Sequence, residues 1–276
     1  MNMTALNIHA LISHRFRGFS EFENTLEGLR AALDFGVQNL EFDVRVAKCG
    51  TLMIYHDEHA LDGSGQSRKL CEHKASEYAD IGEAFARMPT FDALLEIVKA
   101  HKNTTARLLI DIKDYGFEGE IHALVMMHRL AGRAVYVSWL PDVLYRLHAM
   151  APDIPLCLSH WCMPANADIK ASHHVHVSKD GHITRGTQDY IIGERSGWAV
   201  LKPLAGDMLA ILRASGGGVC VPQNMITRDL SAYYHTHKMF VTTFSYTDWD
   251  AINAHKNRFN IDLYFIDNKQ VFDDLA

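Results

Sequence analysis

The chain has 276 residues, of which 48% are hydrophobic and 22% charged, and its formal net charge is −6. This length allows one large domain or two small ones, and the ordinary apolar fraction excludes a low-complexity disordered chain. The negative charge disfavours nucleic acid as the main partner, and no apolar run reaches the roughly 18 residues that a transmembrane segment needs.

The first sixteen residues, MNMTALNIHALISHRF, lack a basic segment followed by a long apolar one. We therefore expect no signal peptide and a cytoplasmic protein. Five cysteines with irregular spacing make a poor disulfide framework, so reduced thiols are the favoured interpretation. Cys157 and Cys162 flank His160, which leaves a thiolate metal site open as a weaker alternative.

Short apolar runs rich in β-formers alternate with segments of helical periodicity. Strands are predicted at Ala10–Arg15, Asn39–Val46, Thr51–Asp57, Arg107–Lys113, Val135–Trp139, Pro155–Ser159, Val219–Gln223, Phe240–Phe244 and Leu263–Asp267. Helices are predicted from about Asn24, where Asn24 can cap and Gly36 can close the helix, and at Phe91–Ala100, Phe117–Leu130, Pro141–Met150, Gly206–Ala214, Thr227–His237 and Thr247–Asn257.

About eight alternations of strand and helix in 276 residues predict an α/β protein with a parallel sheet, and favour a single-domain (β/α)8 TIM barrel over residues 1–276. No G-x-G-x-x-G motif follows the first strand, which argues against dinucleotide binding. Two polar stretches, near residues 59–87 and 161–200, interrupt the alternation and are predicted to be insertions.

Ionisable residues gather where the predicted strands end, which is where barrel enzymes place functional groups. The pairs are His14 and Arg15, Glu41 and Asp43, His56 and Asp57, and Asp111 and Lys113. Carboxylate oxygens suit Mg²⁺, Ca²⁺ or Mn²⁺. Fixed cations beside such a site favour a phosphoryl group, and two histidines can serve as general acid and base.

The alternative is a set of ion pairs at the barrel mouth that holds no metal. Any one pair, such as Glu41 and Asp43, is open to that interpretation. The complete set in this chain order favours a functional site.

These residues resemble the glycerophosphodiester phosphodiesterase family, within the phosphatidylinositol-phosphodiesterase-like barrels. The resemblance is carried by H-R at His14 and Arg15, E-N-T at 23–25, E-x-D-V at 41–44, G-x-x-x-x-H-D at 50–57, and an acidic-x-Lys motif at 111–113. It covers nearly the whole chain apart from residues 161–200.

The resemblance implies hydrolysis of a small-molecule glycerophosphodiester to sn-glycerol 3-phosphate and an alcohol. It makes His14 and His56 the acid–base pair and implies that Arg15 and Lys113 bind the phosphate. Glu41, Asp43 and Asp111 are the implied ligands of one divalent cation, Mg²⁺ or Ca²⁺, with Mn²⁺ as a further candidate. In family terms the glycerol hydroxyl of the substrate attacks phosphorus, and water opens the resulting cyclic phosphate.

The residues that depart from the family pattern include Phe16 and Asp111, besides Ala47, Cys49 and the stretch 242–245. Phe16 stands where a glycine usually follows the arginine, so a differently shaped loop is expected. Asp111 replaces the usual glutamate. These departures leave two rivals open: a sphingomyelinase D-like or phospholipase D-like lipid phosphodiesterase, and a catalytically silent phosphate-binding barrel.

The chain contains 17 histidines, and most carry no argument for function. His160 and His59 are candidate residues at the rim of the site. The cluster His173, His174, His176 and His182 is interpreted as part of an exposed loop rather than a metal site.

Overall fold

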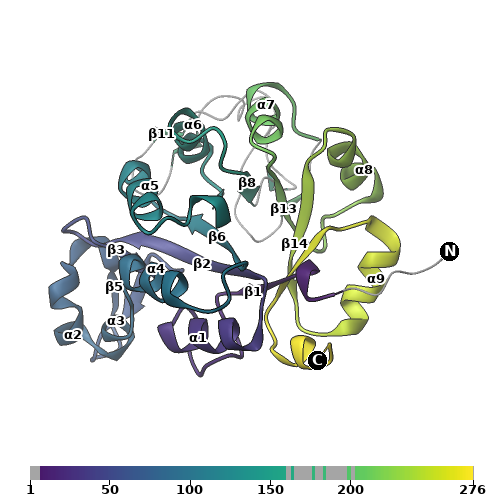
Figure 1. Cartoon of the computed structure of the whole chain (residues 1–276). Coiled ribbons are helices and arrows are strands. Elements are labelled where there is room, and N and C mark those ends of the chain that lie inside the picture. Colours follow the sequence, from purple (N-terminus) through teal and green to yellow (C-terminus); the bar gives the residue numbers. More distant parts are fainter. Residues whose placement is uncertain are drawn as a thin grey trace. The chain divides into compact units, whose positions relative to one another are not determined.

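The structure, a computed structural model, describes residues 7–159 and 203–275, and the backbone of four two-residue strands between them. It contains the predicted alternation of strands and helices (Figure 1). The chain divides into two compact units, one formed by Met1–Ala134 with Asp267–Ala276 and the other by Val135–Ile266.

The first unit contains three parallel strands and most of the residues predicted to be functional. Its strands are β1 (Leu11–His14), β2 (Asn39–Val46), β3 (Leu52–Ile54), β4 (His59–Leu61), β5 (Ser67–Lys69) and β6 (Arg107–Ile112). Its α-helices are α1 (Leu26–Phe35), α2 (Tyr78–Ile81), α3 (Glu83–Ala86), α4 (Phe91–Ala100), α5 (Glu118–Met127) and α10 (Gln270–Asp273). Short 3-10 turns lie at Ile8–Ala10, Leu70–Glu72, Ala75–Glu77 and Ala131–Arg133.

The second unit contains five parallel strands, paired in the order β15-β14-β13-β8-β7. They are β7 (Ala134–Ser138), β8 (Leu156–Ser159), β13 (Gly218–Pro222), β14 (Phe240–Tyr246) and β15 (Leu263–Ile266). The helices are α6 (Pro141–Met150), α7 (Gly206–Ala214), α8 (Arg228–Thr236) and α9 (Trp249–Phe259). Two-residue strands are β9 (Met163–Pro164), β10 (His176–Val177), β11 (Ile183–Thr184) and β12 (Trp198–Ala199).

Within the described residues, each of the eight parallel strands is followed by a helix before the next parallel strand or the chain end. This succession is that of a (β/α)8 barrel, so the predicted fold class is confirmed. Several predicted bounds agree with the structure to the residue, including those of β2, α4, α6 and α7. Thr90 and His101 flank α4, and Pro141 occupies the first position of α6, where proline is favoured.

Strand β2 organises the first unit because all but one of its residues are buried and both of its edges are paired. Strand β6 pairs in parallel along one edge, from Asn39 to Val44. Strand β1 pairs only with Leu40 and Glu41, and β3 pairs with residues 44–46 in the antiparallel direction. Since β6 occupies one edge, β1 and β3 share the other.

The antiparallel direction of β3 corrects one prediction. The run Thr51–Asp57 was expected to end at the same edge as the parallel strands, but only Leu52–Ile54 is a strand and it turns back along β2. The backbone N–H of Tyr55 donates to the carbonyl of Asp43 at 3.1 Å. His56 therefore reaches the level of Asp43 through a reversal of the chain.

The cap of α1 is a second correction. The hydroxyl of Thr25, not the side chain of Asn24, caps the helix by accepting a hydrogen bond from the N–H of Gly28 in the first turn. Gly36 closes the helix in the left-handed conformation at φ 94°, as predicted. Asn24 is buried, and its own backbone is left-handed at φ 57°.

The loop after β1 accommodates Phe16 in a conformation that usually belongs to glycine. Arg15 and Phe16 have φ angles of 55° and 60°, which costs a residue with a Cβ about 1 kcal/mol each. The Phe16 side chain is completely buried and its ring centroid lies 6.1 Å from that of Phe42. Burying an aromatic ring stabilises by roughly 2 kcal/mol, which offsets the local strain at this position.

Part of the sequence interpretation lies outside the described residues. It comprises His160, the side chains of the histidine cluster at 173–182, the role of the 161–200 stretch and the thiol of Cys162. The other four cysteines are present as thiols. Among the described residues, no helix has both the length and the hydropathy required of a membrane span.

Glycine substitutions provide a direct test of the strand packing in the second unit. A Cβ at Gly217 would lie 1.9 Å from the carbonyl oxygen of Leu156, so Gly217→Ala must displace backbone. We expect it to lower the free energy of unfolding by more than about 2 kcal/mol in urea denaturation. The matched control, Gly119→Ala in α5, meets no atom within 4 Å and should be neutral or stabilise by up to about 1 kcal/mol. Equal effects of the two substitutions would contradict this packing.

Candidate active site

The predicted site residues lie together in the first unit, at the ends of β1, β2 and β6. The parallel register places His14 opposite Glu41 and Asp43 opposite Asp111. Glu41 and Asp43 are two residues apart, so their side chains emerge on the same face of β2. Three adjacent strands thus bring four of the predicted residues to one edge of the sheet.

Glu41, Asp43 and Asp111 form a cluster of buried carboxylates. One oxygen from each lies within 4.8 Å of the others, and their exposed fractions are 1%, 1% and 6%. Transferring charged carboxylates from water costs several kcal/mol each unless cations or hydrogen bonds compensate. The groups around this triad therefore decide its protonation.

Two buried cations face the three carboxylates. The Nζ atom of Lys113 lies 2.5 Å from Asp111 Oδ2 and 2.9 Å from Asp43 Oδ1. The Nε atom of Arg15 lies 3.2 Å from Asp43 Oδ2. Asp43 thus lies between both cations, whereas Glu41 accepts one hydrogen bond from the described residues, from the backbone N–H of Arg15 at 3.2 Å. This set of five groups carries one negative charge more than positive when all are ionised.

Glu41 is the carboxylate whose negative charge the surrounding cations compensate least. Burial raises the pKa of Glu41 well above its ordinary value, and the carboxylates of Asp43 and Asp111 raise it further. Burial also raises the pKa of Asp111, because the Lys113 ammonium compensates only in part. For Asp43, by contrast, Lys113 and Arg15 outweigh burial and hold the pKa far below its usual range. Without a further cation, Glu41 and Asp111 therefore hold a proton more readily than ordinary carboxyl groups do.

The carboxylate triad fits a hard divalent cation. Asp111 Oδ1 is buried and has no hydrogen-bond partner, although Asp111 and Lys113 are in contact through the other oxygen. Two oxygens that bind the same ion are separated by at most twice the bond length, roughly 4 Å for Mg²⁺ and 5 Å for Ca²⁺. The oxygens of the triad lie within 4.8 Å of one another, which meets the limit for Ca²⁺, and oxygen is the ligand atom that hard cations prefer.

His14 is held by an aspartate from the far end of the chain. Its Nδ1 atom lies 2.5 Å from Asp267 Oδ1, and its Nε2 atom lies 3.8 Å from Glu41 Oε2. An ionised carboxylate can only accept, so Nδ1 carries the proton and Nε2 presents its lone pair toward the triad. Burial lowers the pKa of His14 although the hydrogen bond to Asp267 raises it. Arg17 Nη1 in turn holds Asp267 at 2.7 Å.

His56 has a similar partner but a more open position. Its Nδ1 atom lies 2.6 Å from Asp57 Oδ1, an exposed carboxylate that can fix the orientation of the ring. The backbone carbonyl of His56 accepts from Arg45 Nε at 3.0 Å, and Asp114 fixes that arginine through a contact of 2.7 Å. The reversal after β3 is thus tied to β2 and to the segment after β6.

Asn24 connects the E-N-T segment to the triad. Its amide nitrogen donates to Asp43 Oδ2 at 2.9 Å, and its amide oxygen lies 3.4 Å from the backbone nitrogen of Asp43. Glu23 binds Arg15 Nη1 at 3.1 Å and Arg17 Nε at 2.6 Å. Glu23 and Asn24 therefore hold Arg15 and Asp43 in place, in addition to beginning the loop before α1.

Sequence reasoning missed Asn24, Asp267, Arg17 and Arg45 as members of the site. For Asn24 the E-N-T motif was the available signal, but helix capping gave a sufficient local explanation. Asp267 follows the last predicted strand directly, so its position at a strand end could have indicated a role. His59, a predicted rim residue, is exposed in β4 and lies 3.9 Å from Glu58.

Comparison with known proteins now decides the family. The sequence profile of the Glycerophosphoryl diester phosphodiesterase family matches residues 12–183, more than half of the chain. The chain belongs to the glycerophosphoryl diester phosphodiesterase family. The matched range contains all seven predicted site residues.

Individual relatives in this family are distant. The chain is 25% identical over 178 residues to human glycerophosphodiester phosphodiesterase 1, which is 58% of this chain and 52% of that protein. The chain thus spans about half the length of that curated relative. A family structure from Silicibacter pomeroyi superposes with a TM-score of 0.71 at 20% identity, covering 98% of this chain and 95% of the other.

A phosphodiesterase from Oleispira antarctica, solved in complex with the product sn-glycerol-3-phosphate, superposes with a TM-score of 0.63. It is 17% identical and covers 96% of this chain and 95% of that chain. At these identities the structural likeness establishes the fold, which is that of this phosphodiesterase family.

The contact of His14 with Asp267 gives the first prediction for this site. Asp267→Asn removes the charge that raises the pKa of His14, so the pKa of the imidazole should fall further below its ordinary value. Proton NMR titration of His14 in EDTA checks this. Asp273→Asn, which removes an exposed carboxylate paired with Lys269 in the same unit, is the control and should leave His14 unchanged. An unchanged or higher pKa in Asp267→Asn would contradict the assignment.

The raised pKa of Glu41 predicts that binding of a divalent cation strengthens with pH. A proton and the cation compete for the same oxygens, and the proton leaves only as the pH rises above the ordinary value of 4.5 toward the raised folded value. Without a cation, this group's contribution to stability is fully present below 4.5 and is lost as pH rises through the folded pKa.

The measurement is the melting temperature with and without Ca²⁺ at pH 5 and pH 8. The increase in melting temperature caused by Ca²⁺ should be larger at pH 8. There, Ca²⁺ at 100 times its Kd stabilises the folded protein by about 2.7 kcal/mol. In Glu41→Gln, the difference between the Ca²⁺-induced increases at pH 8 and pH 5 should be smaller, because the variant has no Glu41 proton to compete with the ion. Equal increases for the unaltered chain at both pH values would show that the triad does not bind the ion.

Proposed function

We propose that the protein hydrolyses a glycerophosphodiester to sn-glycerol 3-phosphate and an alcohol, with one divalent cation at the triad. The observation that carries the proposal is the buried cluster of Glu41, Asp43 and Asp111, with Arg15 and Lys113 in contact with it. Membership of the family and the product complex of the Oleispira antarctica phosphodiesterase support the choice of substrate.

Charge complementarity agrees with a phosphodiester. The three carboxylates, Arg15 and Lys113 sum to one negative charge when ionised, and a divalent cation would change that sum to one positive charge. A phosphodiester carries a single negative charge, so its binding would neutralise the site. Guanidinium and ammonium groups donate strong charge-assisted hydrogen bonds to phosphate oxygens, and here both are already fixed by Asp43.

The two histidines supply proton transfer. His14 and His56 each have Nδ1 fixed by an aspartate, so each is oriented to use Nε2. One imidazole takes the proton of the glycerol hydroxyl as that oxygen bonds to phosphorus, and the other gives a proton to the alcohol oxygen as its bond to phosphorus breaks. In the second step the roles reverse, and water opens the cyclic phosphate to sn-glycerol 3-phosphate.

The site stabilises charge rather than providing a covalent nucleophile. Arg15 and Lys113 lie where the phosphoryl oxygens gain negative charge, and their low exposure, 5% and 7%, strengthens this interaction. When bound, the divalent cation would act as a Lewis acid on the same oxygens. Mg²⁺ and Ca²⁺ are the candidates that the ligand set favours, with Mn²⁺ a third.

Turnover of defined diesters tests the proposal. Glycerophosphocholine and glycerophosphoethanolamine are incubated with Mg²⁺, Ca²⁺, Mn²⁺ or EDTA, and sn-glycerol 3-phosphate is measured. Release that depends on a cation and stops in EDTA is expected. Cleavage of lysophosphatidylcholine alone would replace the proposal with the lipid phosphodiesterase, and binding without turnover on any diester would replace it with a silent barrel.

Single histidine substitutions test the acid–base roles. His14→Ala and His56→Ala should each lower kcat at least about 10²-fold, because each removes one proton donor or acceptor. His9→Ala, an exposed histidine before β1, is the matched control and should keep wild-type turnover. Wild-type kcat in either site variant would remove that histidine from the mechanism.

A further inference from the structure

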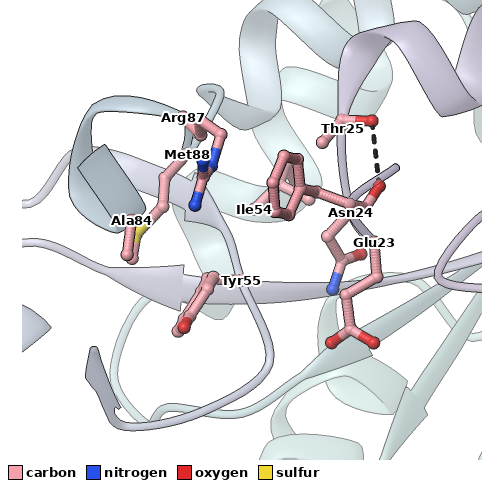
Figure 2. Close-up of a pocket in the computed structure, with 9 residues that line it drawn as sticks. Glu23, Asn24, Thr25, Ile54, Tyr55, Ala84, Arg87 and Met88 are labelled. Carbon is pink, nitrogen blue, oxygen red and sulfur yellow. Dashed lines mark hydrogen bonds between the residues drawn. The ribbon is translucent and has the colours of Figure 1, made fainter. Parts of the chain in front are cut away.

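A pocket adjoins the carboxylate triad on the side of the E-N-T segment. Its walls are Phe22, Glu23, Asn24, Thr25, Ile54, Tyr55, Ala84, Arg87 and Met88, and it encloses about 260 Å³. We call it the Phe22–Met88 pocket. Figure 2 shows Ala84, Arg87 and Met88 on one side of it and residues 23–25 on the other.

Three of the pocket's wall residues bond directly to the site. Glu23 binds Arg15, Asn24 binds Asp43, and the N–H of Tyr55 donates to the carbonyl of Asp43 immediately before His56. When Arg15 holds the phosphate of the substrate, a group attached to that phosphate therefore lies beside this pocket. The volume equals that of roughly nine water molecules, enough for a group of about nine non-hydrogen atoms.

The wall formed by residues 84–88 is held firmly. Phe85 and Met88 belong to a buried cluster with Met53, Leu70 and Tyr78, and Ala84 and Tyr55 pack against it. The N–H of Ile54 donates to the carbonyl of Pro89 at 2.8 Å, which ties this wall to β3. The predicted insertion near 59–87 thus contributes one preformed side of the pocket.

Three polar side chains of the walls are already paired. The Glu23 carboxylate is bonded to Arg15 and Arg17, and the Asn24 amide is bonded to Asp43. The Thr25 hydroxyl is bonded within its own turn and accepts from Gly28. The glycerol hydroxyls, which need hydrogen-bond partners when buried, would find few here. The remaining surface consists of aromatic and aliphatic side chains, together with the Tyr55 hydroxyl and the Arg87 guanidinium.

Arg87 sets the charge preference of the pocket. Its guanidinium carbon lies 3.7 Å from the centroid of the Phe22 ring, and its Nη1 atom lies 2.6 Å from Glu83. The guanidinium therefore covers the Phe22 face that an ammonium group would otherwise use. A cationic alcohol would meet the Arg87 guanidinium, which is paired only with the exposed Glu83 among the described residues, and a carboxylate that two arginines already bind.

We propose that the Phe22–Met88 pocket binds the alcohol side of the phosphodiester and selects alcohols with an uncharged, carbon-rich body over cationic ones. This specificity rests on the proposed hydrolysis. Arg87 and Ala84 are the residues that determine it, Arg87 through charge and Ala84 through the space that its small side chain leaves.

Three synthetic esters of glycerol 3-phosphate, made with methanol, 2-phenylethanol and choline, test the proposal. With the holoenzyme, kcat/KM for the phenylethyl ester should exceed that for the methyl ester at least about tenfold, since filling an apolar pocket contributes this much. The value of kcat/KM for the phenylethyl ester should also exceed the value for the choline ester, although choline is intrinsically the better leaving group.

Two substitutions assign the preference to the pocket. Arg87→Met keeps an unbranched side chain but removes the charge, so the choline-to-phenylethyl ratio of kcat/KM should rise at least about fivefold, whereas Arg87→Lys should preserve it. Ala84→Leu fills the pocket and should lower the phenylethyl-to-methyl ratio at least about tenfold. Arg68→Met, which alters an exposed arginine paired with Asp62 outside the pocket, is the control and should leave both ratios unchanged.

The outcomes separate this proposal from the one it rests on. If the protein cleaves the esters but neither ratio responds to Arg87→Met or Ala84→Leu, the pocket assignment is wrong and the hydrolysis stands. If none of the three esters is cleaved with any divalent cation, the proposed hydrolysis fails and the pocket assignment fails with it.

Discussion

The first unit depends on an imbalance of buried charge. Three carboxylates lie within reach of one another, and among the described residues two buried cations, Arg15 and Lys113, contact them. Burial weakens the screening by water, so a proton or a metal ion is needed to supply the missing positive charge. Burial and the neighbouring carboxylates raise the pKa of Glu41, so this group holds a proton more readily than an ordinary glutamate when no ion is present. A bound hard divalent cation would replace that proton. The cation, Arg15 and Lys113 together would then attract a phosphate.

Strand pairing converts this local chemistry into a site. Strand β2 carries two of the carboxylates, β6 carries the third, and β1 carries His14 and is followed directly by Arg15. Because β3 occupies the remaining edge of β2 in the antiparallel direction, the chain returns to the same level with His56. The stretch after β3 then builds a wall of the adjoining pocket. One strand therefore positions the triad, a histidine and a candidate specificity surface.

Much of this could be predicted from local sequence. The bounds of α4 follow from apolar periodicity and from the flanking Thr90 and His101, and the start of α6 follows from Pro141. The seven candidate residues could be named because they stand at strand ends in a family spacing, and the structure brings them together. Their chemical roles stay predictions, since geometry shows proximity and not turnover.

The remainder depended on contacts that local patterns do not specify. Asp267 is separated by 253 residues from His14, and only the fold brings them together. Asn24 has a side chain that suits a helix cap, but Thr25 takes that role and Asn24 binds Asp43 instead. The direction of β3 was mistaken because a three-residue apolar run carries no information on parallel or antiparallel pairing. Phe16 shows that a buried ring can offset a left-handed backbone that its residue type disfavours.

A crystal structure of the protein grown with Mn²⁺ tests the central claim most directly, through the anomalous scattering of that ion. The charge imbalance predicts one anomalous peak per chain, bound by oxygens of Glu41, Asp43 and Asp111 at about 2.0–2.6 Å, the range for hard divalent cations. An anomalous peak elsewhere, or none in crystals that show the triad still paired only with Arg15 and Lys113, would contradict it.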